Sequence, residues 1–389
     1  MKIAKVFIGD PNNCKGYFNN VIERTKHLID KESQVDCYLI RRSYPLSVKL
    51  LKRQLKLYQP KPEYTVIDNI QFKNIWVSPG VIDYIISHRL NLKLVQNRGQ
   101  LYKHLNEFKD YDLISSHGAE ANYLAMLINK KFSIPYVPTW HGSDINIRPF
   151  KSLFLKNQVK KILNSAYHNF FVSDKLLETS HRISKRKNKS TLYTGPSKSF
   201  IKYNSFEKQQ IKQKLGIQTK YVVGYIGNFE PIKNVTVLPA IFKKIQENIE
   251  QVSFVLVGNG SLGDELQTQI KNSEVSNVHF LGKKNPSDMP DIMNCLDLLI
   301  LPSLNEGMPR AILESLACGV PVVGSNRGGI PEVLSVDNTF NIDSNFVENI
   351  SRRAVEILTT DDINVELPKK FSWEQAIAKE LEVYKNALS

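Results

Sequence analysis

The sequence predicts an α/β protein of two domains, and three observations support this prediction. The chain has 389 residues, which is long for a single hydrophobic core. Short apolar segments alternate with segments of helical periodicity in both halves of the chain, a pattern typical of parallel sheets covered by helices. The third observation is the stretch 305–331, where a polar turn, a helical pattern and a short apolar segment follow one another.

This stretch is expected to complete a strand–helix–strand unit. Residues 298–301 form a short apolar run, which is typical of a buried parallel strand. We expect a helix to begin near Met308 and Pro309, because proline fits the first helical turn, where its missing N–H group costs nothing. The helix should stop at Gly319, and residues 320–323 should form the next buried strand.

Two carboxylates lie near the start of the helix expected in this unit. Glu306 precedes the expected helix and Glu314 lies inside it. The free N–H groups at a helix start favour an anion. A phosphate there, flanked by two carboxylates that bind hydroxyl groups, describes a site for a sugar nucleotide. The alternative is that both glutamates are solvated helix charges.

The first half of the chain has the same alternation. Strands are expected at 3–8, 35–40 and 169–173, with others before His117 and His141. Ligands of parallel sheets bind outside the carboxyl ends of the strands. The loops at Gly9–Gly16, His117 and His141–Asp144 all follow strands, so we expect them to converge on one cleft.

The second half repeats this order after a polar, lysine-rich connection that starts at Gly195. Strands are expected at 221–226, 252–257 and 278–281, and helices at 237–245 and 289–295. A last helix is expected after Ser372, a residue that can cap it. Its apolar stripe would consist of Trp373, Ile377, Leu381 and Tyr384.

Composition narrows the class of protein. The chain is 42% hydrophobic and 23% charged, and it contains no apolar run near the length of a membrane span. Its N-terminus reads as a strand and lacks the apolar core of a signal peptide. These features predict a cytoplasmic protein, in which Cys14, Cys37, Cys295 and Cys318 would be free thiols.

The net charge of +14 indicates an anionic partner: a polyanion, anionic lipid or a phosphorylated substrate. Residues 48–58 read as an amphipathic helix with Lys49, Lys52, Arg53 and Lys56 on its polar side. Such a helix suits a membrane surface, or it packs on the core with a solvated basic face. Nucleic acid is not expected, because the sequence has no aromatic and basic platform and no helix-turn-helix pattern.

Several short motifs occur in order along the chain. They are His141–Asp144, Val255–Gly260, Val278–Gly282, Glu306-x7-Glu314, Gly319–Val323, Gly328–Glu332 and Phe371–Trp373. This ordered set resembles the retaining glycosyltransferases of family 4, which have the GT-B fold. The resemblance implies two Rossmann-like domains whose parallel sheets face each other across a cleft. An acceptor-binding domain would span 1–200, with the last helix, 372–389, packed back on it, and a nucleotide-sugar-binding domain would span 201–371.

The resemblance also implies roles for residues of the second domain. Glu314 would bind the ribose hydroxyls of the donor and Glu306 the hydroxyls of the transferred sugar. The backbone N–H groups of Gly307 and Met308 would lie near the donor, and Lys233 would pair with the departing diphosphate. The other donor-binding positions implied are Gly227, Asn228, Gly258, Gly282 and Lys283. Asn228 stands where the family usually has an arginine, so one charge partner of the diphosphate is missing or is supplied from elsewhere.

In the first domain, the resemblance places His141 among the catalytic residues with Glu306 and Lys233. His117, Asp144 and Gly16 would lie on the acceptor side, although Lys15-Gly16 departs from the family's paired glycines. Each assignment has a plainer alternative. Lys233 could be a surface lysine, His141 a buried hydrogen-bonded histidine, and Asp144 a cap of the following turn.

The function implied is a metal-independent hexosyltransferase that retains anomeric configuration and needs no cofactor besides its nucleotide-diphosphate sugar. We expect a UDP-linked donor and a glycan or polyprenyl-linked acceptor of a bacterial surface polysaccharide. The expected location is the cytoplasm, including the inner face of the cell membrane. Two other functions stay open: a sugar-nucleotide epimerase of the same fold, and a catalytically silent partner that binds sugar nucleotides.

Overall fold

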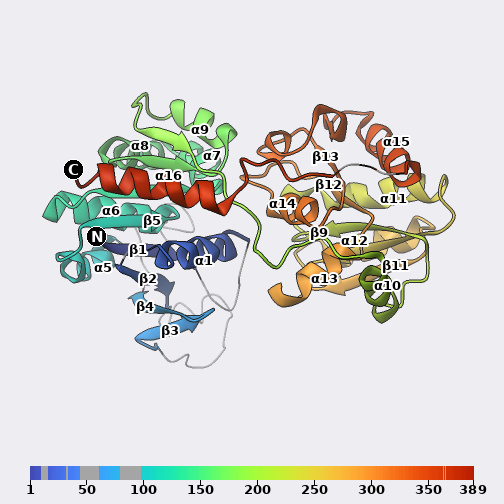
Figure 1. Cartoon of the computed structure of the whole chain (residues 1–389). Coiled ribbons are helices and arrows are strands. Elements are labelled where there is room, and N and C mark those ends of the chain that lie inside the picture. Colours follow the sequence, from blue (N-terminus) through green and yellow to red (C-terminus); the bar gives the residue numbers. More distant parts are fainter. Residues whose placement is uncertain (10–15, 32–33, 44–60, 79–97, 362, 364) are drawn as a thin grey trace. The chain divides into compact units, whose positions relative to one another are not determined.

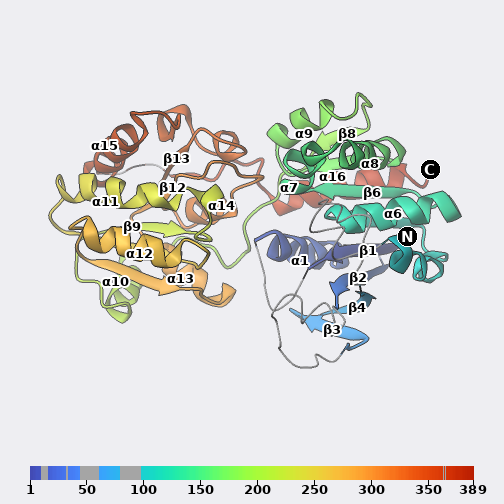
Figure 2. The same ribbon diagram turned by 180° about the vertical axis from the view of Figure 1, so that it is seen from behind.

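A computed structural model describes residues 1–9, 16–31, 34–43, 61–78, 98–361, 363 and 365–389. These residues form two compact units (Figures 1 and 2). The first unit comprises 1–194 together with 373–389, and the second comprises 195–372. The division falls at Thr194, a few residues before the expected boundary at 200, and the C-terminal helix belongs to the first unit.

The first unit is built on an eight-stranded sheet in the order β3-β4-β2-β1-β5-β6-β7-β8. Its strands are β1 (Lys2–Ile8), β2 (Gln34–Arg42), β3 (Tyr64–Ile67), β4 (Ile70–Val77), β5 (Leu113–His117), β6 (Tyr136–Trp140), β7 (Asn169–Phe171) and β8 (Lys189–Thr191). Every neighbouring pair is parallel except β3 and β4, which form an antiparallel hairpin at the sheet edge.

This edge hairpin is not among the elements that we predict from the sequence. Its turn places Asp68 and Asn69 at φ angles of 49° and 64°. Left-handed conformations at both central positions match the right-handed twist of hairpin strands, and aspartate and asparagine tolerate them better than most residues. The Asp-Asn pair is therefore the local signal for this turn.

Helices pack on the sheet of the first unit. They are α1 (Gly16–Ile29), α5 (Arg98–Tyr102), α6 (Ala119–Phe132), α7 (Ser143–Asn146), α8 (Leu153–Ser165), α9 (Asp174–His181) and α16 (Trp373–Asn386). Ser152 and Ser173 cap α8 and α9, because their hydroxyls accept the N–H groups of Leu155 and Leu176. Such caps satisfy backbone donors that a helix start leaves open.

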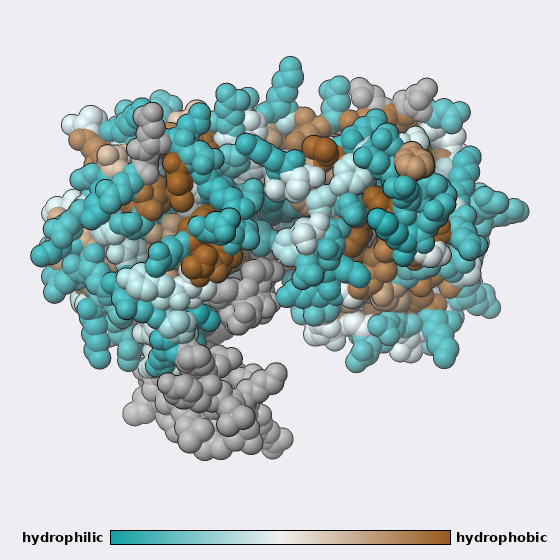
Figure 3. All heavy atoms as spheres, turned by 60° about the horizontal axis from the view of Figure 1, so that its bottom comes forward, coloured by the Kyte–Doolittle hydropathy of each residue, from teal (hydrophilic) through white to brown (hydrophobic). Residues whose placement is uncertain are grey.

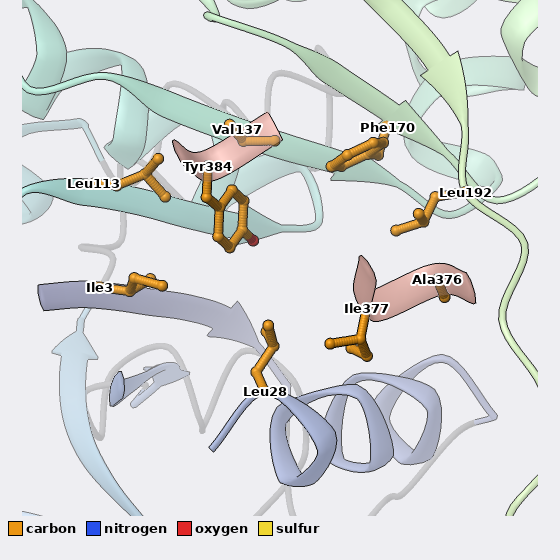
Figure 4. Packing of buried hydrophobic residues seen from close by; sticks show 9 residues of the cluster. All are labelled: Ile3, Leu28, Leu113, Val137, Phe170, Leu192, Ala376, Ile377 and Tyr384. Carbon is orange, nitrogen blue, oxygen red and sulfur yellow. The ribbon is translucent and has the colours of Figure 1, made fainter. Parts of the chain in front are cut away.

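The C-terminal helix α16 is part of the core of the first unit. Ala376, Ile377 and Tyr384 lie in one buried cluster with apolar residues of β1, α1, β5, β6 and β7 (Figure 4). Trp373 is also buried and Leu381 packs against this cluster, so the predicted apolar stripe is confirmed. The last helix thus joins the start of the chain in one hydrophobic core.

A buried ionic cluster fastens α16 to α1 and β1. The Glu380 carboxylate accepts a hydrogen bond from Nε of Arg24 and lies 3.6 Å from Nζ of Lys5, and all three side chains are essentially inaccessible to solvent. Arg24 also donates to the Thr139 hydroxyl at 3.0 Å. Burial lowers the pKa of Lys5 to about 8. Burial also disfavours the Glu380 carboxylate, but Arg24 and Lys5 outweigh this and hold its pKa below the usual range.

The second unit contains a six-stranded sheet in the order β11-β10-β9-β12-β13-β14, and all its strands pair in parallel. The strands are β9 (Tyr221–Ile226), β10 (Val252–Val257), β11 (Val278–Gly282), β12 (Leu298–Leu301), β13 (Val322–Ser325) and β14 (Thr339–Phe340). Its helices are α10 (Ser205–Lys214), α11 (Leu238–Gln246), α12 (Gly263–Asn272), α13 (Met289–Asn294), α14 (Arg310–Ala317) and α15 (Phe346–Thr359).

The predicted elements of the second unit match these bounds closely, with two corrections. The strand expected at 320–323 is β13, Val322–Ser325, because Val320 and Pro321 still belong to the connection that follows Gly319. Helix α14 begins at Arg310 and not at Met308 or Pro309, because Pro309 has extended backbone angles and occupies the N-cap position. Gly319 follows the helix at a φ of 71°, which agrees with the predicted stop. Both predicted sheets are therefore present, each with helices around it.

The surface and the cysteines can be compared with what the composition predicts. On the face shown in Figure 3, hydrophobic side chains form small groups among hydrophilic ones. Within the described ranges, we find no helix that is long and apolar enough to cross a bilayer. Cys37, Cys295 and Cys318 are buried free thiols, whereas Cys14 lies outside the described residues.

Candidate active site

The second unit joins Lys233 and Glu306 at the carboxyl edge of its sheet. Lys233 ends a short 3₁₀ helix, Pro231–Lys233, in the loop after β9, and Glu306 lies in the loop after β12. Because β9 and β12 are neighbours, their following loops meet. The ammonium of Lys233 donates to Oε1 of Glu306 at 2.6 Å, and the two side chains are 22% and 11% exposed. Sequence reasoning selected both residues, and the fold brings them into direct contact.

Hydrogen bonds fix the position of Glu306. The Ser303 hydroxyl donates to the same oxygen, Oε1, at 2.8 Å. Ser303 is itself held by the buried Ser325 hydroxyl, which donates to its carbonyl at 2.5 Å. The carbonyl of Glu306 accepts the Gly329 N–H at 3.1 Å. The carboxylate is therefore held from both its side chain and its backbone.

Gly328 explains why glycines follow β13. Its φ is 58°, and a Cβ atom there would lie 2.2 Å from the Glu306 carbonyl oxygen. A side chain at this position would have to push the backbone of Glu306 away, and the left-handed conformation also disfavours one. The sequence motif that begins at Gly328 thus supports the Glu306 loop.

Glycines also shape the edge beyond β9 and β10. Gly258 has a φ of 139°, and a Cβ atom there would lie 1.9 Å from the carbonyl oxygen of Gly227. The Gly258 N–H bonds the carbonyl of Gly282 at 2.9 Å. Gly227, Gly258 and Gly282 therefore form adjoining backbone at the ends of three neighbouring strands. Glycine is required at position 258 because the Gly227 backbone occupies the space that a side chain would need.

Two predicted donor-binding residues are exposed. The side chains of Asn228 and Lys283 both lie at the surface, after β9 and β11 respectively. The buried Tyr225 hydroxyl donates to the Asn228 carbonyl at 3.0 Å, which holds the backbone of this turn. Both residues thus lie at the sheet edge where a donor would bind, and their side chains do not contact each other.

Glu314 lies inside α14 and is paired with Arg310 one turn earlier. Nη2 of Arg310 is 3.2 Å from Oε1 of Glu314, and the glutamate side chain is 16% exposed. Burial raises the pKa of Glu314, and the Arg310 charge opposes this. Gly307 and Met308 precede the helix, so they stand between the two carboxylates in the chain. Arg310 is a contact that sequence reasoning missed, although its spacing of four residues is typical of helix ion pairs.

The first unit brings His117 and His141 together. His117 ends β5, and His141 follows the neighbouring strand β6. Nδ1 of His117 lies 3.2 Å from Nε2 of His141. Phe7 stacks on the His117 ring, and Tyr17 packs edge-on against the ring of His141. Burial lowers the pKa of His141 to about 3 and that of His117 well below its usual range, with Arg24 and Lys5 adding to both effects, so the pair is neutral.

Asp144 orders the turn that carries His141. Its carboxylate accepts the N–H of Gly142 at 2.8 Å and the N–H of His141 at 3.1 Å. Burial raises the pKa of Asp144, and these backbone bonds oppose that shift. The side chain is 8% exposed. Asp144 therefore holds the turn that carries His141.

An ionic cluster beside this site was not found from the sequence. Glu120, at the start of α6, is buried and pairs with Arg148 at 3.2 Å and with Arg42. Burial opposes ionisation, but the two arginines hold the pKa of Glu120 below its usual range. The available signal was Gly118, which follows β5 as the N-cap of α6, with a φ of 87°, and places Glu120 in the first helical turn.

Two sequence predictions lie mainly outside the described residues. The loop at 9–16 is described only at its ends, where Gly16 begins α1. Its expected convergence with the histidine loops therefore stays a prediction. The basic amphipathic segment at 48–58 is also outside the described ranges.

Comparisons with known proteins agree with this architecture. Residues 46–195 match the family model described as Glycosyltransferase Family 4, and residues 207–375 match the model described as Glycosyl transferases group 1. Uncharacterized glycosyltransferase MJ1178 of Methanocaldococcus jannaschii is 27% identical over 74% of this chain and 79% of its own length.

A second relative and a solved structure extend the comparison. The UDP-Gal:alpha-D-GlcNAc-diphosphoundecaprenol alpha-1,3-galactosyltransferase of Escherichia coli is 29% identical over 61% of this chain and 64% of its own length. The structure of Anabaena Alr3699/HepE in complex with UDP is similar with a TM-score of 0.73 at 18% identity, over 99% of this chain and 100% of that one.

Two parallel-sheet α/β units of this kind define the GT-B class of glycosyltransferases. The chain belongs to the family 4 type, since the two family models match consecutive parts of it in the expected order. It is therefore a glycosyltransferase. The comparisons give no support to the epimerase alternative.

Proposed function

We propose that the chain moves a hexosyl group from a UDP-linked sugar to a glycan or polyprenyl-linked acceptor, with retention of configuration and without a metal ion. The observation that carries this proposal is the Lys233–Glu306 pair at the carboxyl edge of the second sheet. A diphosphate leaves the sugar as a dianion, and a preorganised cation at that point stabilises the transition state.

The geometry of Glu306 suits a hydroxyl-binding role. Lys233 and Ser303 both donate to Oε1. Among the described residues, no protein donor is seen for Oε2, so this oxygen can accept a sugar hydroxyl. The Lys233 ammonium has three donors, so it can contact a phosphate oxygen and keep its bond to Glu306. One short contact would thereby link recognition of the sugar to charge stabilisation of the leaving group.

The backbone edge beside this pair would receive the nucleotide. The backbone of Gly227, Gly258 and Gly282 lies together at the ends of β9, β10 and β11, where a base and a ribose would meet main-chain groups. Glu314 is partly exposed and forms an ion pair with Arg310. Its carboxylate would accept hydrogen bonds from the ribose hydroxyls. The Anabaena protein of the same fold was solved in complex with UDP, which supports a uridine nucleotide as the ligand of this edge.

A screen of nucleotide sugars tests this donor assignment. We expect UDP-sugars to raise the melting temperature, because a ligand that binds only the folded state stabilises it by about 3 kcal/mol at one hundred times its Kd. For a unit the size of the second one, residues 195–372, the shift should be roughly 5–10 °C. GDP- and ADP-sugars at the same concentration should give smaller shifts, and equal shifts for all three bases would contradict a uridine-specific site.

The silent-partner alternative makes a different prediction in the same preparation. It would show the thermal shift but release no UDP when glycan or lipid-linked acceptors are added. The Lys233–Glu306 contact favours catalysis, because a binding protein has no need for a cation held against the sugar-binding carboxylate. Release of UDP that depends on an acceptor would decide for the transferase.

A membrane-linked acceptor is supported by an exposed surface of the first unit. Ile147, Phe150, Leu153 and Phe154 are 41%, 41%, 74% and 42% exposed. Leu153 and Phe154 begin α8, whereas Ile147 and Phe150 lie in the segment just before it. The chain contains no aspartate or glutamate between Asp144 and Asp174. In the same interval the exposed lysines are Lys151, Lys160 and Lys161. Apolar side chains among cations suit the interface of an anionic bilayer.

Vesicle binding tests this surface. We expect the double variant Leu153→Glu and Phe154→Glu to bind vesicles of anionic phospholipid at least about tenfold more weakly, because two exposed apolar side chains lose a favourable transfer of roughly 1–2 kcal/mol each. Phe206→Glu is the matched control, since Phe206 is 72% exposed on α10 of the second unit. Equal binding by the double variant and the wild type would exclude this surface. A wild type that is dimeric in solution beside a monomeric double variant would assign the surface to self-association.

A further inference from the structure

A row of buried polar groups connects His141 with the C-terminal helix. Nε2 of His141 lies 3.2 Å from Nδ1 of His117, whose Nε2 lies 3.5 Å from the Ser115 hydroxyl. The Ser115 hydroxyl is 2.7 Å from the Tyr384 hydroxyl, which contacts the Glu380 carboxylate. The last four side chains are completely buried, whereas His141 is partly exposed and ends the row.

The direction of these hydrogen bonds is set at the Glu380 end. Arg24 and Lys5 hold Glu380 ionised, so its oxygens can only accept hydrogen bonds. The Tyr384 hydroxyl has one proton, and burial beside the carboxylate raises its pKa well above the usual range. Tyr384 therefore donates its proton to Glu380, and its oxygen is left to accept (Figure 4 shows the ring among apolar residues).

The direction of the Tyr384–Glu380 hydrogen bond fixes which group donates in each of the following contacts. Because Tyr384 has already used its proton, the Ser115 hydroxyl must donate to the oxygen of Tyr384. Ser115 can then only accept from His117, which requires a proton on Nε2 of that ring. A neutral imidazole carries one proton, so Nδ1 of His117 is an acceptor and Nε2 of His141 is the donor toward it.

The row therefore fixes which ring nitrogen of His141 can accept a hydrogen bond. With its single proton on Nε2, the ring presents an unprotonated Nδ1. Within the described part of the chain, Nδ1 of His141 meets no hydrogen-bond donor. A partly exposed acceptor of this kind recognises a hydroxyl group, whereas a phosphate or carboxylate oxygen would require a donor.

We propose that Tyr384 and Glu380 are positioning residues, which hold His141 in the Nε2–H tautomer so that its Nδ1 accepts a hydrogen bond from a substrate hydroxyl. The tautomer follows from the contacts of the first unit alone. Its use for a sugar hydroxyl rests on the proposed glycosyl transfer. The C-terminal helix would thus have two roles. It packs in the core, and it sets the direction in which the hydrogen bonds between Tyr384 and His141 are donated.

The variant Tyr384→Phe tests this proposal because it removes one oxygen from the row. The Ser115 hydroxyl then has no acceptor at position 384 and is free to donate to Nε2 of His117. That reversal moves the proton of His117 to Nδ1, which in turn donates to His141 and leaves the proton of His141 on its own Nδ1. We expect both rings to change tautomer.

The measurement is long-range nitrogen–proton NMR of the full chain labelled at histidine, in which protonated and unprotonated ring nitrogens have distinct shifts. Signals are assigned with the His117→Gln and His141→Gln variants. Tyr136→Phe is the matched control. Tyr136 is a buried tyrosine of β6 in the same unit, and its hydroxyl contacts the Ile162 carbonyl and the Ser165 hydroxyl, outside this row. It should leave both tautomers unchanged at a similar loss of stability.

The outcomes separate this inference from the proposed function. Wild-type tautomers other than Nε2–H, or unchanged tautomers in Tyr384→Phe, would overturn the positioning role whatever the activity. If the tautomers switch as expected, kcat for transfer should fall at least about tenfold, which corresponds to about 1.4 kcal/mol, while the thermal shift with UDP stays the same. A switch in tautomer with kcat unchanged would refute the substrate role of Nδ1 and leave the transferase assignment untouched.

Discussion

Glu306→Ala should reduce kcat for sugar transfer by about 10²–10³ while the fold is retained, the range seen when one preorganised group that stabilises a transition state is removed. The carboxylate accepts from Lys233 at 2.6 Å and from Ser303 at 2.8 Å, and it stands at the edge where the donor would bind. Its loss removes the hydroxyl acceptor for the sugar and frees Lys233 from its fixed position. Transfer is measured as UDP release and product formation with a responsive acceptor.

The nucleotide should still bind to this variant. Glu314 and the glycines after β9, β10 and β11 are unchanged, so the thermal shift with UDP alone should remain. Glu348→Ala is the matched control, because Glu348 also accepts from a lysine of the same unit, Lys244 at 2.6 Å, but this pair is exposed on α15. Undiminished transfer by Glu306→Ala would refute the assignment of this site.

Much of the second unit could be predicted from the sequence because local signals and tertiary structure agree there. The apolar runs at 221–226 and 252–257 are the strands β9 and β10 with the predicted bounds, and Gly319 ends α14 as expected. Lys233 and Glu306 could each be selected from their motifs. Their direct contact could not be predicted, since it depends on β9 and β12 being neighbours despite the strands that separate them in the chain.

The first unit was harder to predict because its important contacts join distant segments. Glu380 meets Lys5 and Arg24 across almost the full length of the chain, and a glutamate between apolar helix positions gives no local sign of a buried partner. The Glu120 cluster joins β2, α6 and the 3₁₀ helix Arg148–Lys151 in the same way. The hairpin of β3 and β4 had a local signal in Asp68-Asn69, but its strands are short and lie at a sheet edge.

Replacing Glu380 with leucine should produce the largest loss of stability. The substitution leaves Lys5 and Arg24 buried without their anion, and removing one partner of a buried ion pair costs about 3–5 kcal/mol. The first unit should then melt roughly 10 °C lower, as thermal unfolding followed by circular dichroism would show. Glu382→Leu is the control on the same helix, because Glu382 is exposed and its replacement should change the melting temperature little.

The pH dependence of this loss has a defined sign. The pKa of Glu380 is lower in the folded chain than in the unfolded one, so its stabilisation is complete above the ordinary pKa of a glutamate. As the pH falls below that value, the unfolded chain takes up the proton first, and the advantage of the wild type over Glu380→Leu shrinks. A difference in unfolding free energy that stays constant from pH 7 to pH 3 would show that the leucine acts through packing, and that the buried carboxylate does not hold the C-terminal helix by its charge.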